Sequence, residues 1–325
     1  MAELTRNDAA YVCNGAAAGL FLATLACITG DDRVAIGRLP DLGPRCEVVI
    51  HRAHRMPMDP AIVLTGARLV EVGNIMRTDP WELQGALTER TAAVVHMAGD
   101  FFTQGALALG QTVEIAHAAG VPVIVDAAAQ LPPPDNLWHY TREAGADLAV
   151  FSGGKDLCGP QASGMVLGRA DLIEACFLHG SPHTRLARPM KVGKEEIVGL
   201  VAALEHYLAQ DHDARLAGYE AAVQEWVHDL GGLPGVRVER SFPNTMGQPI
   251  PRALVVVLPE VTGVDAGELH RRLLTGEPPV AVRLRPNDSR LYLSPDTVAE
   301  HDVPIVSGRI REELTRAAGR SGPGA

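Results

Sequence analysis

Lysine is rare in this chain, and one lysine stands where chemistry is expected. Of 29 basic side chains only Lys155, Lys191 and Lys194 are lysines. Lys155 follows the apolar run DLAVF after a Ser-Gly-Gly turn. In an open α/β sheet, ligands bind at the carboxyl ends of the strands. A shielded lysine amine at such an edge can form a Schiff base with an aldehyde cofactor. By position alone an exposed loop lysine is the commoner explanation, so Lys155 is a candidate whose assignment depends on the residues around it.

A second candidate is an aspartate at the end of the preceding strand-like run. Asp126 closes the segment VPVIVD. By itself this carboxylate is as readily explained as a helix cap or a surface residue. Next to the ring nitrogen of pyridoxal phosphate, however, a carboxylate holds that nitrogen protonated and lets the ring store electrons. Because Asp126 and Lys155 follow two consecutive strands, together they indicate a pocket for this cofactor.

The segment CNGAAAGLFLATLA predicts a binding site for phosphate. A strand-like AAYVC runs into Gly15, Ala16 and Ala17 and then into a helix. Small residues let the backbone approach a ligand, and the free N–H groups at a helix start bind phosphate. The segment matches neither G-x-G-x-x-G nor a Walker loop, so a dinucleotide or a nucleoside triphosphate is disfavoured.

The elements that must position these residues alternate between about residues 45 and 170. Short runs rich in β-branched residues are separated by helix-like stretches such as DPWELQGALTER. Runs that are apolar at every position are typical of strands buried on both faces. The pattern therefore predicts an α/β fold: a three-layer, mostly parallel sheet with helices on both faces.

The second half of the chain has a different pattern. Residues 193–230 predict a continuous helix that links two domains, with apolar positions at spacings of three and four. Shorter strands then mix with helices near 265–274 and 304–317, which predicts a small α+β domain. The expected organisation is a large cofactor-binding domain at 1–210, a small C-terminal domain at 211–318 and a disordered tail at 319–325.

Composition narrows the class of protein. A net charge of −10 argues against nucleic acid as a partner, because phosphate binding needs basic patches. The five cysteines are widely spaced and form no CxxC pair, which disfavours both a disulfide framework and a zinc site. There is no signal-peptide pattern, and the longest apolar stretch is too short to span a bilayer. We expect a cytoplasmic protein without a membrane partner.

Four blocks of sequence carry a family resemblance. They are NGAAAGL, VIVDAAAQLPPPDNLW, GADLAVFSGGKDLCGPQASGMVLGRADLI and RPMKVGKEEIVGL, and they cover most of residues 5–210. They resemble the selenium-transferase-like family of fold type I pyridoxal phosphate enzymes, which includes seryl-tRNA(Sec) selenium transferase and D-glucosaminate-6-phosphate ammonia-lyase. The resemblance implies an aminotransferase-like large domain and pyridoxal 5'-phosphate as cofactor.

The resemblance also implies roles for single residues. Lys155 is the lysine that forms the Schiff base, and Asp126 pairs with the ring nitrogen. Ser152 lies near the phosphate or the lysine. The implied cofactor-binding set is Gly15, Ala16, Ala17, Asp126, Ser152 and Lys155. Members usually carry a further N-terminal segment before the phosphate loop, and we expect it to be absent or truncated here.

Substrates of such enzymes carry a carboxylate, which an arginine usually binds with both of its nitrogen arms. Arg188 lies in one of the family-like blocks and is the first candidate. Arg55 and Arg77 lie in loops expected on the same side. Further options are Arg283 of the small domain for the substrate, and His54 or His96 for stacking on the cofactor ring.

The reaction predicted is that of a lyase or transferase acting on a small amino acid or a phosphorylated amino sugar acid. Lys155 removes the α-proton as general base, and a β-substituent is then eliminated or replaced. The alternatives are an aminotransferase and a catalytically degenerate relative that binds the cofactor without turnover. We also expect a homodimer or larger even-numbered assembly, because the apolar stretch AAAGLFLATLACI is expected to be half exposed without a partner.

Overall fold

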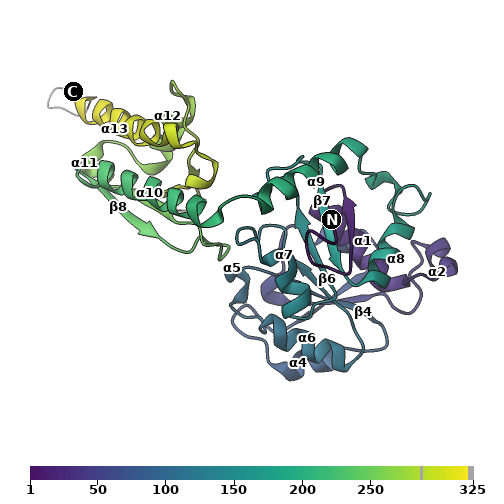
Figure 1. Ribbon diagram of the computed structural model, residues 1–325. Coiled ribbons are helices and arrows are strands. Elements are labelled where there is room, and N and C mark those ends of the chain that lie inside the picture. The colour runs from purple at the N-terminus through teal and green to yellow at the C-terminus, as the bar shows by residue number, and fades with distance from the viewer. Residues whose placement is uncertain (286–287, 321–325) are drawn as a thin grey trace. The chain divides into compact units, whose positions relative to one another are not determined.

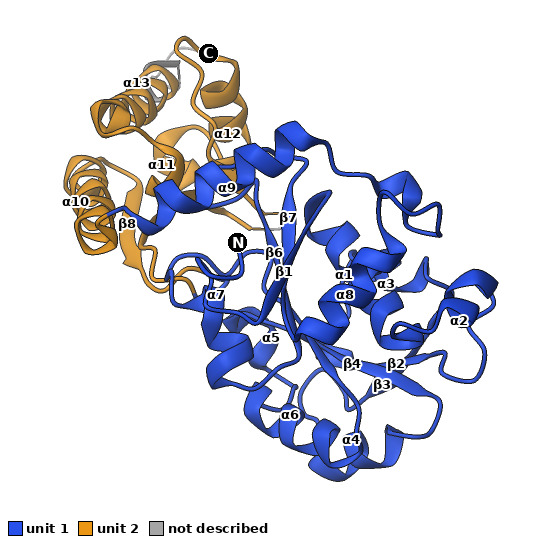
Figure 2. Cartoon of the chain, turned by 45° about the vertical axis from the view of Figure 1, so that its right-hand side comes forward, with its two compact units in different colours: residues 1–210, 245–247 blue, residues 211–244, 248–325 orange. Residues whose placement is uncertain are grey.

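The computed structural model describes residues 1–285 and 288–320 (Figure 1). Residues 321–325, most of the expected tail, lie outside the described residues. The chain divides into two compact units, coloured separately in Figure 2. The first contains Met1–Gln210 and Thr245–Gly247, and the second contains Asp211–Asn244 and the residues from Gln248 onward.

Seven strands form the sheet of the first unit, in the order β1-β7-β6-β5-β4-β2-β3. Strands β2 to β6 pair in parallel, whereas β7 is antiparallel to both β6 and β1. Two reversals leave β1 parallel to β6, so the carboxyl ends of six strands meet at one edge. The bounds are β1 (Ala9–Cys13), β2 (Glu47–His51), β3 (Arg68–Val72), β4 (Thr91–Met97), β5 (Val123–Asp126), β6 (Leu148–Ser152) and β7 (Gly164–Gly168).

Helices cover both faces of this sheet and complete three layers. On one face the core contains side chains of α1 (Gly15–Thr29), α3 (Pro60–Val63) and α8 (Ala170–His179). On the other it contains α4 (Pro80–Ala86), α6 (Leu109–Ala118) and α9 (Lys194–Leu208). The predicted fold class is therefore confirmed. The shorter elements are α2 (Arg33–Arg38), η1 (Arg52–His54), α5 (Asp100–Thr103), α7 (Asn136–Trp138), the π-helix η2 (His139–Glu143) and η3 (Arg188–Met190).

Helix α1 corrects one expectation. Its sequence has no charged residue, and every residue from Ala18 to Thr29 is buried within the chain. The helix packs against α8 and several strands, and a β-carbon added at Gly19 would lie 2.7 Å from the Val150 side chain. The expectation that a partner must cover this apolar stretch is wrong, because the first unit buries it.

The second unit is an α+β layer with its own core. Its four-stranded antiparallel sheet has the order β10-β11-β9-β8. Trp226 is fully buried and donates from Nε1 to the Val303 carbonyl at 2.9 Å. The elements are α10 (His212–Gly231), β8 (Val236–Ser241), β9 (Arg252–Val257), α11 (Pro259–Thr262), α12 (Ala266–Thr275), β10 (Arg283–Leu284), β11 (Arg290–Leu293), η4 (Pro295–Thr297), η5 (Glu300–Asp302) and α13 (Val303–Arg320).

The helix expected at 193–230 is two helices. It breaks between α9 and α10, where the Asp211 carboxylate accepts a hydrogen bond from the Ala214 N–H at 2.9 Å. This is a helix N-cap, and it coincides with the boundary between the units. In the described part of the chain, no helix is both long and apolar enough to cross a membrane.

Candidate active site

A pocket of about 310 Å³ opens at the edge where the carboxyl ends of the strands meet. Its walls come from the start of α1, the end of β4 and the segments that follow β5 and β6. The structure brings all six residues predicted to hold the cofactor to this one pocket: Gly15, Ala16, Ala17, Asp126, Ser152 and Lys155.

The start of α1 presents unsatisfied backbone donors to the pocket. Asn14 precedes the helix without capping it by its side chain, and no acidic residue lies in the first turn. The first N–H groups and the positive end of the helix dipole are therefore available to an anion. Strand β7 supports the turn closely: a β-carbon at Gly164 would lie 2.7 Å from the Gly15 carbonyl carbon and 2.9 Å from the Ala16 nitrogen.

Asp126 is the last residue of β5 and is 7% exposed. The Ala128 N–H donates to its Oδ1 at 3.0 Å. Burial raises the pKa of this carboxyl group, although the Ala128 hydrogen bond and the Lys155 charge act in the opposite direction. A buried carboxylate needs a cationic or strongly donating partner. A protonated ring nitrogen meets that need.

The loop from Ser152 to Lys155 requires its two glycines. The Gly153 N–H donates to the Ser163 carbonyl at 2.9 Å, and a β-carbon at Gly153 would lie 2.1 Å from the Ser163 hydroxyl oxygen. A β-carbon at Gly154 would lie 2.8 Å from the Cα of Gln161. The tight loop leaves Lys155 exposed at the pocket. The glycines therefore allow the close packing of the loop that places Lys155 at the pocket.

Two glutamines at the pocket were missed in the sequence. Gln161 lines the pocket and donates from Nε2 to the Gly154 carbonyl at 3.0 Å. Gln130 is buried behind the wall, and its Nε2 lies 3.2 Å from the Ala98 carbonyl and 3.3 Å from the Met246 carbonyl. Ala98 and Met246 both line the pocket. The block VIVDAAAQLPPP contains Gln130 and offered the one signal for it.

The rest of the pocket wall is apolar and was also not predicted. It consists of Met56, Met58, Met97, Ala98, Phe102 and Met246 beside α1. Such a wall suits the faces of a flat aromatic ring. His54 and His96, of which one was an option for stacking on that ring, are not among the described lining residues. His54 lies behind the wall, where its Nε2 is 3.1 Å from the Phe102 carbonyl.

The predicted substrate arginines lie elsewhere, since no arginine is among the described residues that line the pocket. Arg188, at the start of η3, donates to the Ser181 hydroxyl at 2.8 Å. Arg77 pairs with Asp79 at 2.6 Å, and Arg55 pairs with Asp59 and Glu71. Arg283 is exposed on β10 in the second unit.

The fold and the position of the pocket define the class: fold type I, the aminotransferase-like fold of pyridoxal phosphate enzymes. A family model described as "L-seryl-tRNA selenium transferase" matches residues 1–219, and the chain belongs to that family.

Two relatives match most of the chain. It is 35% identical over 301 residues to the 5'-C-glycyluridine monooxygenase-decarboxylase of a Streptomyces species, covering 90% of this chain and 72% of that protein. It is 33% identical over 325 residues to the D-glucosaminate-6-phosphate ammonia lyase of Salmonella typhimurium, covering 98% and 84%. A solved structure of D-glucosaminate-6-phosphate ammonia-lyase superimposes with a TM-score of 0.82 at 32% identity, covering 98% of this chain and 84% of that one.

Proposed function

We propose that this chain is a pyridoxal 5'-phosphate-dependent lyase that acts on a phosphorylated amino sugar acid and releases ammonia. One observation carries the proposal: a lysine, a buried aspartate and an uncapped helix start line the same pocket. The chain around them is 33% identical to an ammonia lyase over 325 residues. The selenium-transferase activity of other members is not proposed, because a chain of net charge −10 does not favour tRNA.

The residues of the pocket fit the cofactor. The N–H groups of Gly15, Ala16 and Ala17 would bind its phosphate, and the Asp126 carboxylate would accept a hydrogen bond from its protonated ring nitrogen. Ser152 would lie near the phosphate or the lysine, and Lys155 would hold the cofactor covalently at its aldehyde group. When bound, the cofactor supplies an electron sink for the negative charge that develops at the substrate's α-carbon.

The chain's own groups then perform the proton transfers. Lys155 Nζ would take the proton from the substrate's α-carbon as general base and would give a proton to the leaving β-hydroxyl group as general acid. Asp126 keeps the ring nitrogen protonated throughout. The apolar wall excludes water, which strengthens these charge interactions. Loss of water across the α and β carbons leaves a product that hydrolyses to a 2-oxo acid and ammonia.

Arg188 is the arginine we favour for the substrate's carboxylate or phosphate. Its described partner is the neutral Ser181 hydroxyl, so its charge is not already neutralised. Arg55 pairs with two carboxylates and Arg77 with one. Each must break its ion pairs before it can bind the substrate, which costs more than breaking a hydrogen bond to a hydroxyl group. We retain Arg55 and Arg77 as second candidates.

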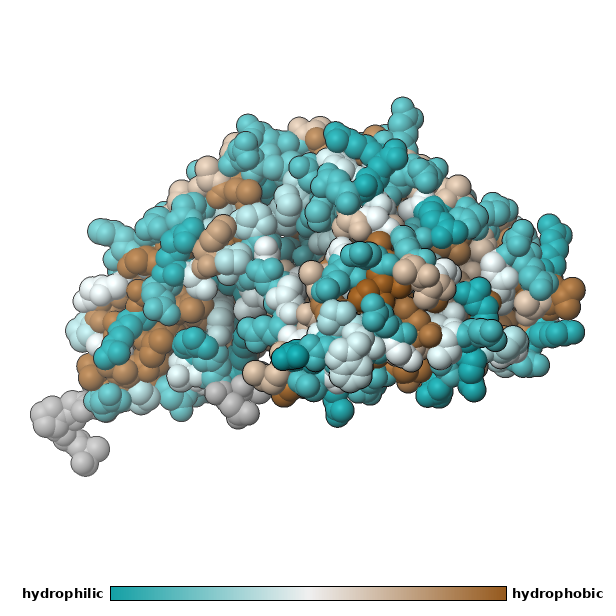
Figure 3. Space-filling model, turned by 90° about the horizontal axis from the view of Figure 1, so that it is seen from below, coloured by the Kyte–Doolittle hydropathy of each residue, from teal (hydrophilic) through white to brown (hydrophobic). Residues whose placement is uncertain are grey.

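We also propose that the chain works as a homodimer or larger even-numbered assembly. A second, mainly apolar cleft shares Ala17 and Met58 with the cofactor pocket and extends to Phe21 and Leu64. Met58, Leu64 and Phe101 are exposed large apolar side chains. On the face drawn in Figure 3, apolar groups lie among hydrophilic ones.

We propose a cytoplasmic location for the chain. All five cysteines are free, which fits a reducing compartment.

A substrate comparison tests the proposed reaction. The chain, reconstituted with pyridoxal 5'-phosphate, is given D-glucosaminate 6-phosphate with and without oxygen, and ammonia is measured. We expect ammonia at the same rate in both conditions. The 35% identity to the Streptomyces enzyme favours a second candidate, oxidative decarboxylation. Oxygen uptake and carbon dioxide release from 5'-C-glycyluridine, without ammonia from the sugar acid, would replace the first proposal by the second.

Two further outcomes separate the remaining alternatives. Transfer of the amino group to an added 2-oxo acid, without free ammonia, would identify an aminotransferase. Bound cofactor without turnover of any of these substrates would identify a degenerate relative.

A further inference from the structure

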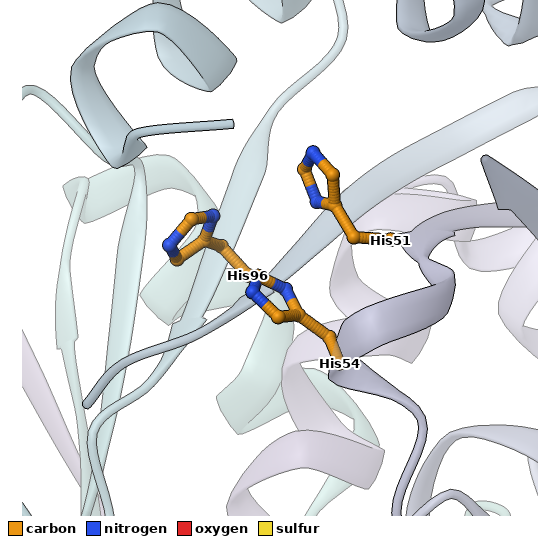
Figure 4. Close-up of side chains that lie close together, drawn as sticks. All are labelled: His51, His54 and His96. Atoms are coloured by element: carbon orange, nitrogen blue, oxygen red, sulfur yellow. The ribbon is translucent and has the colours of Figure 1, made fainter. Parts of the chain in front are cut away.

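Three buried histidines meet behind the wall of the cofactor pocket. His51 ends β2, His54 ends the short helix η1, and His96 is the penultimate residue of β4. Their exposed fractions are 0%, 0% and 7%. One nitrogen of each lies within 4.8 Å of one nitrogen of each of the others. Figure 4 shows the three rings close together.

The hydrogen bonds of the three rings are incomplete. His54 uses both of its nitrogens: Nδ1 accepts from the Met97 N–H at 3.2 Å, so Nε2 carries the proton and donates to the Phe102 carbonyl at 3.1 Å. Among the residues that the structure describes, none is a hydrogen-bond partner of either nitrogen of His51 or of Nδ1 of His96. Buried polar atoms are nearly always satisfied in folded proteins. Three unsatisfied imidazole nitrogens in one place therefore point to a bound ligand.

The chemistry of the side chains indicates what kind of ligand. An uncharged imidazole offers one nitrogen lone pair to a ligand. Within the described residues this group of ligands contains histidines alone. Uncharged imidazoles are preferred ligands of zinc, copper, nickel and iron ions, whereas magnesium and calcium prefer oxygen.

The arrangement of the rings agrees with a shared ion. Three imidazoles bound to one tetrahedral ion through bonds of about 2.0–2.1 Å have ring centroids about 5 Å apart. Here the centroids are separated by 4.9 Å, 5.8 Å and 4.6 Å, and the rings meet edge to face.

We propose that His51, His54 and His96 bind one divalent transition-metal ion of the Zn²⁺ class. His51 and His96 contribute nitrogens that have no other partner. His54 contributes Nδ1, exchanging the 3.2 Å hydrogen bond from Met97 for the ion, while Nε2 continues to donate to the Phe102 carbonyl. A backbone carbonyl on the second nitrogen is the usual support of a metal-bound histidine.

The ion has a structural role at this position. It joins the end of β2 to the end of β4, and its ligand His54 contacts the backbone of Met97 and Phe102, which both line the cofactor pocket. The three rings leave the fourth position of a tetrahedral ion to a water molecule. We assign the ion a structural role because all three of its ligands are buried. The inference is independent of the proposed reaction.

Metal titration tests the site. The full chain is freed of metal with a chelator and titrated with Zn²⁺ against a chromophoric chelator, and with Co²⁺ by visible absorption. We expect one tight equivalent and the intense absorption bands of tetrahedral, nitrogen-bound Co²⁺. His51→Gln and His96→Gln should each weaken binding at least about 100-fold, since changes even to the supporting partners of metal ligands cost 10- to 100-fold.

His179→Gln is the matched control. His179 is also fully buried, with an unpartnered Nδ1, but it lies outside the cluster and bonds to the Thr29 hydroxyl at 2.9 Å. This variant should bind Zn²⁺ as the unchanged chain does. Far-UV circular dichroism and cofactor absorbance establish that each variant is folded.

Two results would overturn the site. One is absence of a tight equivalent, or binding that His51→Gln and His96→Gln leave unchanged. The other comes from the unchanged chain crystallised with Zn²⁺, which decides the matter even if the variants do not fold. An anomalous peak bonded to the three rings supports the site, and density of an ordered water alone contradicts it.

Discussion

Two buried aspartates, at opposite edges of the same sheet, have opposite surroundings. Asp147 lies just before β6, at the edge where the strands begin, and is 4% exposed. It accepts hydrogen bonds from the Val123 N–H at 2.7 Å, His117 at 2.8 Å and Arg169 at 2.6 Å. Asp126, at the edge where the strands end, accepts one from Ala128 and faces the pocket.

The difference separates a structural charge from a functional one. One backbone donor and two cationic or basic side chains satisfy the charge of Asp147 inside the chain. These interactions contribute to the free energy of folding and leave little bonding capacity for a ligand. Asp126 keeps bonding capacity for a group that the chain itself does not supply. Burial without full satisfaction is costly, and such sites are enriched where ligands bind. We expect the two edges to respond differently to substitution.

Replacing Lys155 should have the largest effect. Lys155→Ala removes the covalent link and the general base, and a general base alone contributes about 10²- to 10⁴-fold. We expect ammonia release from D-glucosaminate 6-phosphate to fall at least about 1,000-fold, measured at saturating cofactor. Lys194→Ala is the control, because its side chain is 89% exposed at the start of α9 and should leave the rate unchanged.

Substitution of Asp126 should affect mainly activity, and substitution of Asp147 should affect mainly stability. Asp126→Asn should lower the rate about 100- to 1,000-fold, the usual effect of removing one preorganised charge interaction. The free energy of unfolding without cofactor should change little, because a poorly satisfied buried charge is removed. Asp147→Asn should instead cost about 3 kcal/mol of stability while the folded protein keeps its turnover. Urea unfolding and initial rates on both variants measure this, and similar losses of activity in both would refute the distinction.

The pH dependence of stability tests the cost of burying a side chain that can take up a proton, with His179 as the example. Burial lowers its pKa to about 4 from 6.5, so below pH 6.5 the unfolded chain binds a proton that the folded chain refuses. The stability is complete above pH 6.5 and is lost as pH falls towards 4. Linkage makes this about 2 kcal/mol at pH 5. Urea unfolding between pH 7.5 and 5 should show a pH dependence that is smaller by this amount in His179→Gln than in the unchanged chain.

The smallest effect expected is at the phosphate-binding turn. Gly164→Ala places a β-carbon 2.7–2.9 Å from backbone atoms of Gly15 and Ala16 and must displace the turn. We expect cofactor affinity to fall about tenfold, which corresponds to about 1.4 kcal/mol. Gly218→Ala is the control. Gly218 is exposed on α10, and a β-carbon there would have nothing within 4 Å, so the change should raise stability by about 0.5–1 kcal/mol without changing cofactor affinity. Equal affinity in both variants would contradict a close approach at Gly164.

The parts of the fold that could be predicted are those set by local pattern. Strands β2, β4, β5 and β6 are apolar runs that a sheet buried on both faces requires, and they showed where Asp126 and Lys155 lie. What could not be predicted depends on which strands are neighbours. β4 pairs with β2 rather than with β3, and this order alone brings His96 to His51.

The same limit applies to single residues of the site. Gln130 and Gln161 lie in loops without periodicity, and their role depends on carbonyl groups that are distant in sequence. Met246 reaches the pocket from a three-residue segment that returns to the first unit. The break before α10 was missed because the residues around Asp211 are compatible with a helix. Asp211 can be identified as the cap of a new helix only when the boundary between the units is known.

The central claim is that the lysine at the carboxyl edge holds pyridoxal 5'-phosphate. It is tested most directly by reducing the reconstituted protein with borohydride, digesting it and locating the labelled lysine by mass spectrometry. Three lysines compete for the label, and only Lys155 lines the pocket among the described residues. The account predicts one cofactor per chain, attached to Lys155. Stoichiometric label on Lys191 or Lys194, with Lys155 unmodified, would contradict it.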